Sequence, residues 1–476
     1  MAQMIPLEDY VAQVLETLSP LENGRLALEQ AHGRVLAEDV TAVVPVPPWT
    51  NSAMDGYAVR ARDTDSAAPH APVVLPVAAD VPAGAAPAPL APGTAQRIMT
   101  GAMLPENADA VVKVEDTDQA PGPHPPPAEV GIRVAARPGL NVRQAGEDVG
   151  IGDSVLTAGT LMTATAVASL ASVGLSAVRA FPRPRVAVVS TGAELVEPGQ
   201  ELPAGAIPDS NSLLLAGLVA EHGARLASVS RSVDTAESLA TALIEAARGA
   251  DLIVTSGGVS AGAFDPLVML AEDDEDGENG ENTADGTVRL RLSKVAMQPG
   301  KPQGHGTVRA DDGREVPLIM LPGNPVSVLV SFRTIVAPAL ARLMGHDGVV
   351  GTGETSGSGG GPAALVLPRT GARPPVRARA AEAWKTAGGR RQYIPVRFVP
   401  APAGAAAPGA ATAETVPQPS DGAVGPAYWV APTHRLGSGS HLVASLHAAQ
   451  ALAVVDAEVE AVEVGDELPL IPLSAS

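Results

Sequence analysis

The stretch Asp251-Leu252-Ile253-Val254-Thr255-Ser256-Gly257-Gly258 begins as an apolar run and ends in two glycines. A second stretch has the same form, because Val316-Pro317-Leu318-Ile319-Met320 runs into Leu321-Pro322-Gly323-Asn324-Pro325. Each apolar run predicts a buried strand, so each glycine segment lies where a strand ends at the rim of a sheet. Glycines let backbone N–H groups approach an anion closely, and Asn324-Pro325 predicts a helix that begins at the same rim. Two such segments on one sheet predict a phosphorylated ligand.

Residues 183–344 alternate between predicted strands and predicted helices. The strands are expected at 185–189, 226–233, 251–255, 287–297 and 316–321. The helices are expected at 212–222, 236–248, 266–271 and 325–343. This alternation predicts a mainly parallel sheet with helices on both faces, that is, a three-layer α/β domain. Ligands bind such sheets at the carboxyl ends of the strands, where Ser190-Thr191-Gly192 also falls.

The flanking segments predict three further domains. Amphipathic helices are expected at 6–18 and 25–38, and a third helix at 163–173. Short Val-rich strands predict a small β module over 43–137, and β-like pieces after 345 predict a C-terminal β domain interrupted by Gly/Ala/Pro-rich stretches at 351–363 and 400–426. The expected fold class is therefore multidomain α/β plus β. Its expected domains are an elongated linker domain (1–42 with 138–180), the β module (43–137), the α/β domain (181–344) and the C-terminal β domain (345–476).

The composition limits the classes of protein to consider. A chain of 476 residues is long enough for two to four domains. The formal net charge of −20 disfavours nonspecific binding to nucleic acid or to an anionic membrane. The absence of cysteine excludes disulfides, thiolate metal sites and cysteine nucleophiles. The first residues lack a signal-peptide pattern and no uninterrupted apolar run is long enough to span a bilayer, so we expect a soluble, cytoplasmic protein with neither nucleic acid nor membrane as partner.

Several common sites are disfavoured by the motifs. The nine histidines show no HxxxH or HxH spacing, which disfavours a zinc enzyme. No P-loop or GxGxxG motif follows a predicted strand. The acidic run at 272–276 predicts a solvated loop rather than a metal site.

Three carboxylates are candidates for metal binding or proton transfer. Asp55 in Asn51-Ser52-Ala53-Met54-Asp55-Gly56 belongs either to a simple Asp-Gly turn or to a functional site at a strand entry. Glu147 and its neighbour Asp148 could hold Mg²⁺ through oxygen ligands, or could form a solvated turn. Asp265 could be a further metal ligand, or the N-cap of a helix before Pro266.

Cations and hydroxyls supply candidate anion contacts. The chain has only four lysines, and two of them, Lys294 and Lys301, flank a predicted strand end and a Pro-Gly turn. As point charges they suit an oxyanion or a phosphate, although a lone surface lysine usually has no such role. Thr100-Gly101 ends another predicted strand with a hydroxyl, which could contact a phosphate.

The ordered motifs of this chain resemble those of the MoeA/gephyrin E-domain family, the molybdenum insertases. They run through essentially the whole sequence: NSAMDGYAV at 51–59, TGAMLP at 100–105, ADAVVKVED at 108–116, GLNVRQAGED at 139–148, VAVVSTGAEL at 186–195, IPDSNS at 207–212, SGGVSAGAFD at 256–265, VAMQPGKP at 295–302 and LPGNPVS at 321–327. Residues 389–393 and 437–440 are similar to motifs of the family's C-terminal domain.

The resemblance implies a four-domain homodimer that takes part in molybdenum cofactor biosynthesis. It implies that molybdate is inserted into adenylylated molybdopterin with Mg²⁺, releasing AMP and molybdenum cofactor. The cleft would lie between the α/β domain of one subunit and the β module of the other. Transient contact with the adenylyltransferase and with molybdoenzyme chaperones is also implied.

Site residues follow from the resemblance motif by motif. The catalytic and metal-binding residues would be Asp55, Glu147 and Asp265. Molybdate would be placed by Lys294, Lys301, Arg390 and Ser440. Substrate contacts would come from Thr100, Gly101, Ser190, Thr191, Asp209, Asn211, Ser256, Gly257, Gly258, Pro299, Lys301, Pro322, Gly323, Asn324, Pro325 and Ser327.

Two positions depart from the family pattern. Ala193 stands where many members have an acidic residue, and Thr50 stands where many have Asp. The acidic insertion near 272–286 and the Gly/Pro-rich insertions are also not family features. A scaffold role without catalysis, as in gephyrin, is the alternative; the carboxylates and lysines favour the enzyme, while Ala193 favours the scaffold.

Overall fold

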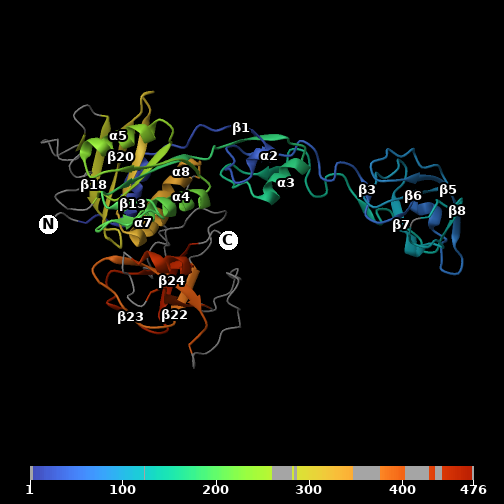
Figure 1. Cartoon of the computed structure of the whole chain (residues 1–476). Coiled ribbons are helices and arrows are strands. Elements are labelled where there is room, and N and C mark those ends of the chain that lie inside the picture. Colours follow the sequence, from blue (N-terminus) through green and yellow to red (C-terminus); the bar gives the residue numbers. More distant parts are fainter. Residues whose placement is uncertain are drawn as a thin grey trace. The chain divides into compact units, whose positions relative to one another are not determined.

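The computed structural model describes residues 4–122, 124–259, 281–282, 287–346, 376–402, 428–434 and 442–473. These residues form two compact units, and each is described by itself (Figure 1). Unit 1 contains residues 1–24, 33–35 and 181–476, and unit 2 contains residues 25–32 and 36–180. The four domain boundaries expected from the sequence stay a prediction. The expected helix at 266–271, the acidic run at 272–276 and the stretch at 351–363 lie outside the described residues.

A seven-stranded sheet forms the centre of unit 1. Its strands, in spatial order, are β15 (Arg225–Ser232), β12 (Arg185–Thr191), β16 (Leu252–Ser256), β21 (Glu315–Leu321), β20 (Pro302–Arg309), β18 (Val288–Lys294) and β17 (Glu281–Asn282). The pairs from β15 to β21 are parallel, whereas β20, β18 and β17 extend the sheet in antiparallel fashion. The strands expected from the apolar runs are confirmed, and β20 is a strand that the sequence did not predict.

Alternate residues of the parallel strands pack on opposite faces of this sheet. Val186 and Val188 of β12 belong to one buried cluster, and Ala187 and Val189 belong to another. The first cluster includes side chains from α1 (Leu7–Glu16), α4 (Asn211–Glu221) and the helix that begins at Pro325, while the second includes α5 (Ala236–Ala247). Because strand side chains alternate with a period of two, helices cover both faces. The three-layer α/β domain is confirmed.

The helix from Pro325 to Leu343 is deeply buried in unit 1. It comprises α7 (Pro325–Ser331), a π-helical segment η3 (Phe332–Val336) and α8 (Ala337–Leu343). Pro338 has no backbone N–H to donate to a carbonyl of the preceding helical turn. The missing hydrogen bond accounts for a π-helical segment at this point. The helix has a mean hydropathy of 1.6 and the length of a membrane span, although Arg333 and Arg342 interrupt its apolar sequence. It is nonetheless 94 % buried inside the structure, as the core helix of a folded domain is.

One of the two expected N-terminal helices is confirmed and the other is wrong. α1 lies within the expected 6–18 and buries Tyr10, Val11 and Val14. Residues 25–38 form β1 (Gly24–Ala27) and the single turn α2 (Leu28–Ala31) instead. β1 pairs with β11 (Ala177–Ala180), and the chain leaves the helical conformation at His32 (φ −55°, ψ 129°), directly before Gly33 with its left-handed φ of 73°. Tertiary strand pairing therefore overrides the helical pattern.

The C-terminal part of unit 1 is a small, closed β structure. Its sheet has the order β19 (Met297–Gln298), β24 (Arg391–Val399), β25 (Trp429–Pro432), β22 (Val376–Ala380), β28 (Glu467–Pro472) and β26 (Ala451–Val455), and β26 also pairs with β24. A short pair, β23 (Trp384–Lys385) with β27 (Ala461–Val462), and the turn η4 (Val443–Ala448) complete it. The extra pairing closes the sheet on itself, so the expected C-terminal β domain is confirmed.

Unit 2 contains a five-stranded sheet and a smaller helical part. The sheet has the order β7 (Ala110–Lys113), β4 (Gly56–Val59), β6 (Ala95–Ile98), β5 (Val73–Val81) and β8 (Glu129–Ile132). Short pairs join β3 (Asn51–Ser52) to β9 (Val142–Arg143) and β2 (Val40–Thr41) to β10 (Ser154–Leu156). The expected helix at 163–173 is α3 (Ala164–Ser172), which begins where the Thr163 hydroxyl accepts a hydrogen bond from the Ala166 N–H.

Candidate functional site

Three neighbouring strands of unit 1 end together at one rim of the sheet. Ser190 of β12 pairs with Ser256 of β16, which pairs with Leu321 of β21. Thr191 is the last residue of β12, Gly257-Gly258 follows β16 and Pro322-Gly323 follows β21. The rim predicted from the two glycine stretches is therefore present, with its segments side by side.

The Gly257 position tolerates no side chain. Its φ is 89°, and a Cβ there would lie 2.7 Å from both the carbonyl oxygen and the Oγ1 of Thr191. A Cβ on Gly323 would lie 3.4 Å from the Cα of Gly257, so the two glycine segments touch. The Gly257 N–H donates to the Leu321 carbonyl across 3.0 Å. That hydrogen bond holds the two segments together, and the expected substrate contacts of Gly257 and Gly258 stay predictions.

Two hydroxyls at the end of β16 are buried without a hydrogen-bond partner among the described residues. They are Thr255 Oγ1 and Ser256 Oγ. Buried hydroxyls normally find partners, so such atoms next to a glycine loop indicate a place for ligand or water. Ser260, which follows in the sequence, lies outside the described residues.

The second glycine segment leads directly into the core helix. Asn324 is the N-cap residue in an extended conformation, and Pro325 occupies the first turn. Gly323 and Asn324 are exposed, whereas Pro322 and Ser327 are buried. The backbone N–H groups of a helix start favour an anion, as predicted from Asn324-Pro325.

The first turn of α4 is tied to the same rim by side-chain hydrogen bonds. Asn211 Nδ2 donates to the Gly323 carbonyl across 2.6 Å. Ser190 Oγ lies 2.6 Å from Ser212 Oγ. Asp209 is only 3 % exposed and accepts hydrogen bonds from Ser212. Asp209, Asn211 and Ser190 are thus brought together with the glycine segments, but they lie beneath the surface.

Cationic residues gather around the 294–301 turn. Lys294 ends β18 and pairs in register with Pro302, the neighbour of Lys301. Both lysines are exposed. Arg390 Nη2 donates to the Gln298 side chain across 2.9 Å, so this arginine also lies at the turn. Pro299 is buried within it. The structure brings Lys294, Lys301 and Arg390 to one turn, while the fourth expected molybdate residue, Ser440, lies outside the described residues.

Asp55 lies at a strand entry in unit 2. Its Oδ1 accepts hydrogen bonds from the Thr100 N–H (2.6 Å) and the Thr100 hydroxyl (2.7 Å). These bonds, the backbone bond first, lower the pKa of Asp55 below its ordinary value, so the exposed carboxylate is ionised at neutral pH. The next residue, Gly56, has to be glycine, because a Cβ there would lie 2.0 Å from the Val112 carbonyl oxygen. The Asp-Gly turn and the functional carboxylate are therefore compatible interpretations of the motif.

The structure shows less about the other two expected metal ligands, Glu147 and Asp265. Glu147 is exposed, and its Oε2 accepts a hydrogen bond from the Gln144 N–H across 2.9 Å. Asp265 lies outside the described residues. In the part of the chain that the structure describes, no three Asp, Glu or His side chains form a metal-binding group. The metal set of Asp55, Glu147 and Asp265 stays a prediction.

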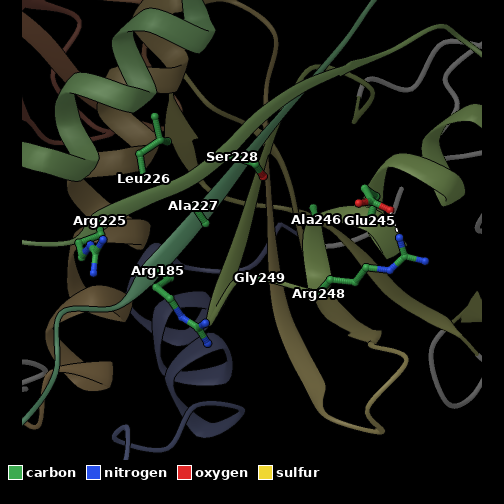
Figure 2. A pocket seen from close by; sticks show the side chains of 9 residues that line it. All are labelled: Arg185, Arg225, Leu226, Ala227, Ser228, Glu245, Ala246, Arg248 and Gly249. Carbon is green, nitrogen blue, oxygen red and sulfur yellow. Dashed lines mark hydrogen bonds and ion pairs between the residues drawn. The ribbon is translucent and has the colours of Figure 1, made fainter.

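A cavity of about 500 Å³ lies elsewhere in unit 1. Figure 2 shows its lining, which includes Arg185 at the start of β12, Arg225 at the start of β15 and Arg248 after α5. Arg185 pairs with Asp251 across 2.7 Å, and Arg248 pairs with Asp311 across 2.7 Å. The cavity opens at the amino ends of the parallel strands, opposite the rim where ligands bind such sheets. Its paired arginines fit a structural role, so we do not assign the substrate there.

Sequence reasoning missed two residues at the rim. Ser212 joins Ser190 to Asp209, and Arg231 of β15 lies 3.7 Å from Asp209. A lone arginine in an arginine-rich chain carries no sequence signal. Ser212 could have been found, because it closes the IPDSNS motif at 207–212.

Comparison with known proteins gives consistent matches. Residues 5–174 match the family model for the MoeA N-terminal region (domain I and II), and residues 187–342 match that for a probable molybdopterin binding domain. The chain is 44 % identical over 336 residues to molybdopterin molybdenumtransferase 2 of Mycobacterium tuberculosis, covering 70 % of this chain and 78 % of that protein. It is 37 % identical over 317 residues to molybdopterin molybdenumtransferase of Nostoc sp., covering 66 % and 68 %. The solved structure of a molybdopterin biosynthesis MoeA protein from Pyrococcus horikosii aligns over 100 % of both chains at 29 % identity, with a TM-score of 0.71.

Proposed function

This chain belongs to the MoeA family of molybdopterin molybdenumtransferases, transferases of molybdenum cofactor biosynthesis, and we propose that it inserts molybdate into adenylylated molybdopterin and releases AMP and molybdenum cofactor. The alternative of a non-catalytic scaffold is less well supported, because relatives at 37–44 % identity are named as transferases.

The observation that carries the proposal is the contact between the two glycine segments at the strand rim. Gly323 lies against Gly257, and both follow strands whose carboxyl ends meet. Such a rim offers backbone N–H groups of Gly258 and of the helix that begins at Pro325 to phosphate oxygens. Ser256 Oγ adds a hydroxyl that has no partner among the described residues. We assign the phosphates of the nucleotide-linked pterin to this surface.

Molybdate is assigned to the cationic turn. A dianionic oxyanion needs compact positive charges and N–H donors, which Lys294, Lys301 and Arg390 supply. Arg390 is held in place by Gln298, so its guanidinium is oriented before substrate binds. Ser440 completes the proposed set. These residues bind and orient the oxyanion, and none acts as a nucleophile.

The carboxylates of the chain fit Mg²⁺. Mg²⁺ prefers carboxylate oxygens and water, and Asp55 offers an ionised, exposed carboxylate that Thr100 holds through one oxygen. Glu147 is exposed as well, and Asp265 is the third proposed ligand. When bound, Mg²⁺ would neutralise phosphate charge and polarise a phosphoryl oxygen. Thr100 and Gly101 would position the Asp55 carboxylate and the adjacent phosphate.

Three further properties belong to the proposal. We expect a homodimer, a cytoplasmic location, and transient contacts with the adenylyltransferase and with molybdoenzyme chaperones. Sedimentation of the purified chain tests the dimer, since a monomer at micromolar concentration would contradict it.

The reaction is tested by incubating purified protein with adenylylated molybdopterin, molybdate and Mg²⁺. AMP and active molybdenum cofactor are the expected products, with cofactor detected by reconstitution of an apo-molybdoenzyme. Omission of molybdate is the control for adventitious hydrolysis of the nucleotide. Absence of AMP release with intact substrate contradicts the proposed reaction.

A further inference from the structure

The guanidinium of Arg231 lies beside the buried carboxylate of Asp209. The Oδ1 of this carboxylate accepts the Ser212 N–H (3.0 Å), and its Oδ2 accepts the Ser212 hydroxyl (2.6 Å). Arg231 Nε lies 3.7 Å from Oδ2. A carboxylate that is 3 % exposed costs free energy unless a cation and hydrogen bonds compensate it. Arg231 is the cation that lies beside this carboxylate, where Asp209 accepts the hydrogen bonds of Ser212 in the first turn of α4.

The same guanidinium also holds the segment that precedes α4. Arg231 Nη2 lies 2.9 Å from the carboxylate of Glu197. Glu197 directly follows β13 (Leu195–Val196), and Asp209 directly follows β14 (Ile207–Pro208). These two strands pair in parallel, and the Asp209 N–H donates to the Val196 carbonyl across 2.9 Å. Arg231 thus joins both ends of the segment 195–209 to β15.

The direction of the hydrogen bonds follows from the number of hydroxyl hydrogens. Ser212 has one hydroxyl hydrogen, which it donates to Asp209. The bond of 2.6 Å between the hydroxyls of Ser190 and Ser212 must therefore be donated by Ser190. Ser190 is fully buried, so its hydroxyl holds β12 to α4 instead of reaching a phosphate. A series of polar contacts thus runs from Arg231 through Asp209 and Ser212 to Ser190, on the strand β12 that ends at the rim.

The first turn of α4 connects these polar contacts to the glycine segments. Asn211 lies between Asp209 and Ser212 in sequence and donates to the Gly323 carbonyl. Gly323 in turn lies against Gly257. A turn that loses its cap at Asp209 would therefore release Gly323 as well as Ser190.

We propose that Arg231 is a positioning residue for the substrate rim, acting through Asp209 on the first turn of α4. This rests on the proposed function, in which the rim binds the pterin nucleotide. Asp209 and Ser190 then hold the substrate site in place from the protein interior, and the exposed residues of the glycine segments contact the ligand.

The test compares Arg231→Gln with Arg231→Lys and with Arg289→Gln. Arg289 is a matched control, since it is a partly exposed arginine of the same sheet that pairs with Glu315 across 3.1 Å. For Arg231→Gln we expect the KM for adenylylated molybdopterin to rise about tenfold with kcat changed less than about threefold, because binding geometry is lost rather than a reacting group. Arg231→Lys should restore much of the KM. Amide hydrogen exchange over 195–216 should be faster by about tenfold in Arg231→Gln and unchanged in Arg289→Gln.

A double-mutant cycle decides whether Arg231 acts through Asp209. In the Asp209→Asn background the buried charge is gone and only the pair with Glu197 remains, so adding Arg231→Gln should change the KM and the exchange rate by clearly less than it does in the wild-type background. Full additivity, or an Arg231→Gln protein with the KM and exchange of Arg289→Gln, would overturn the proposal. If the wild-type protein releases no AMP, the proposed reaction fails, and hydrogen exchange still decides the role of Arg231.

Discussion

Asn211 donates a hydrogen bond from its side-chain amide to the carbonyl of Gly323 across 2.6 Å, joining positions 112 residues apart. The residue type at 211 matters because the contact needs an N–H donor. An acceptor in the same place would face another acceptor. One polar side chain therefore fixes the first turn of α4 to the Pro322-Gly323 segment.

Replacing Asn211 by Asp should destabilise the protein more than replacing it by Ala. Alanine removes one hydrogen bond, worth about 1 kcal/mol, whereas the isosteric aspartate places a carboxylate against the Gly323 carbonyl. Urea unfolding of the two variants measures the order. A more stable Asp variant would show that the amide N–H is not what holds Gly323.

Gly257→Ala should destabilise the protein by at least about 1–3 kcal/mol and abolish substrate binding. The new Cβ would meet Thr191 at 2.7 Å with a backbone φ of 89°. Gly217→Ala is the matched control, because that glycine lies inside α4 with open space around it. The control should be neutral or stabilised by about 0.5–1 kcal/mol. Thermal unfolding measures both, and equal effects would contradict the steric account.

Asp55→Asn should lower AMP release by about 100-fold or more while the fold is kept. The amide oxygen can still accept the hydrogen bonds of Thr100, so only the charge is lost. Asp153→Asn is the control, since Asp153 likewise accepts a backbone N–H, from Gly150 across 2.7 Å. Initial rates of AMP release at varied Mg²⁺ measure the effect. Retained activity in Asp55→Asn would remove this residue from the proposed metal site.

The pKa of Asp55 predicts a defined pH dependence of stability. Its folded-state pKa is lowered below the ordinary 3.8, so its contribution is fully present above that value and is lost as the pH falls through the folded pKa. The stability difference between wild type and Asp55→Asn should therefore be constant from pH 5 to 7 and shrink below about pH 4. Thr100→Ala should move the pKa back toward its ordinary value only in part, because the backbone N–H remains. Carboxyl NMR titration measures this, and an unshifted pKa in the wild type would contradict it.

Lys294→Gln and Lys301→Gln should each raise the KM for molybdate by about tenfold, and the effect should weaken in high salt. Lys385→Gln is the control, since it removes an exposed lysine of β23 in the same unit. Rates of AMP release at varied molybdate measure the change. An equal effect of all three substitutions would show that only net charge matters.

The sequence predicted the fold best where an apolar run coincides with a buried strand. β16 and β21 were located because their residues are continuously apolar, as strands buried on both faces are. β20 was missed because Gly304 and Gly306 interrupt its pattern. These glycines are needed since a Cβ on Gly306 would lie 1.9 Å from the Arg289 carbonyl. The strand is thus specified by its neighbour and not by its own side chains.

The sequence predicted which segments form the candidate site, but it did not predict which of their residues contact each other. The two glycine loops, Asp55 and the lysines were located from their own local patterns. The bond from Asn211 to Gly323 and the pair of Arg231 with Asp209 are set by tertiary packing, which leaves no local trace in the sequence. The helix expected at 25–38 failed for a related reason, because the partner strand β11 lies far along the chain.

The buried cluster under the α/β sheet also contains Tyr393, Leu452 and Ile471 from the C-terminal β structure, packed with Phe332 and Ile335 of the core helix. The β structure is thus not a detachable module. A chain ending before residue 376 would expose this apolar surface and should aggregate instead of yielding a smaller working enzyme.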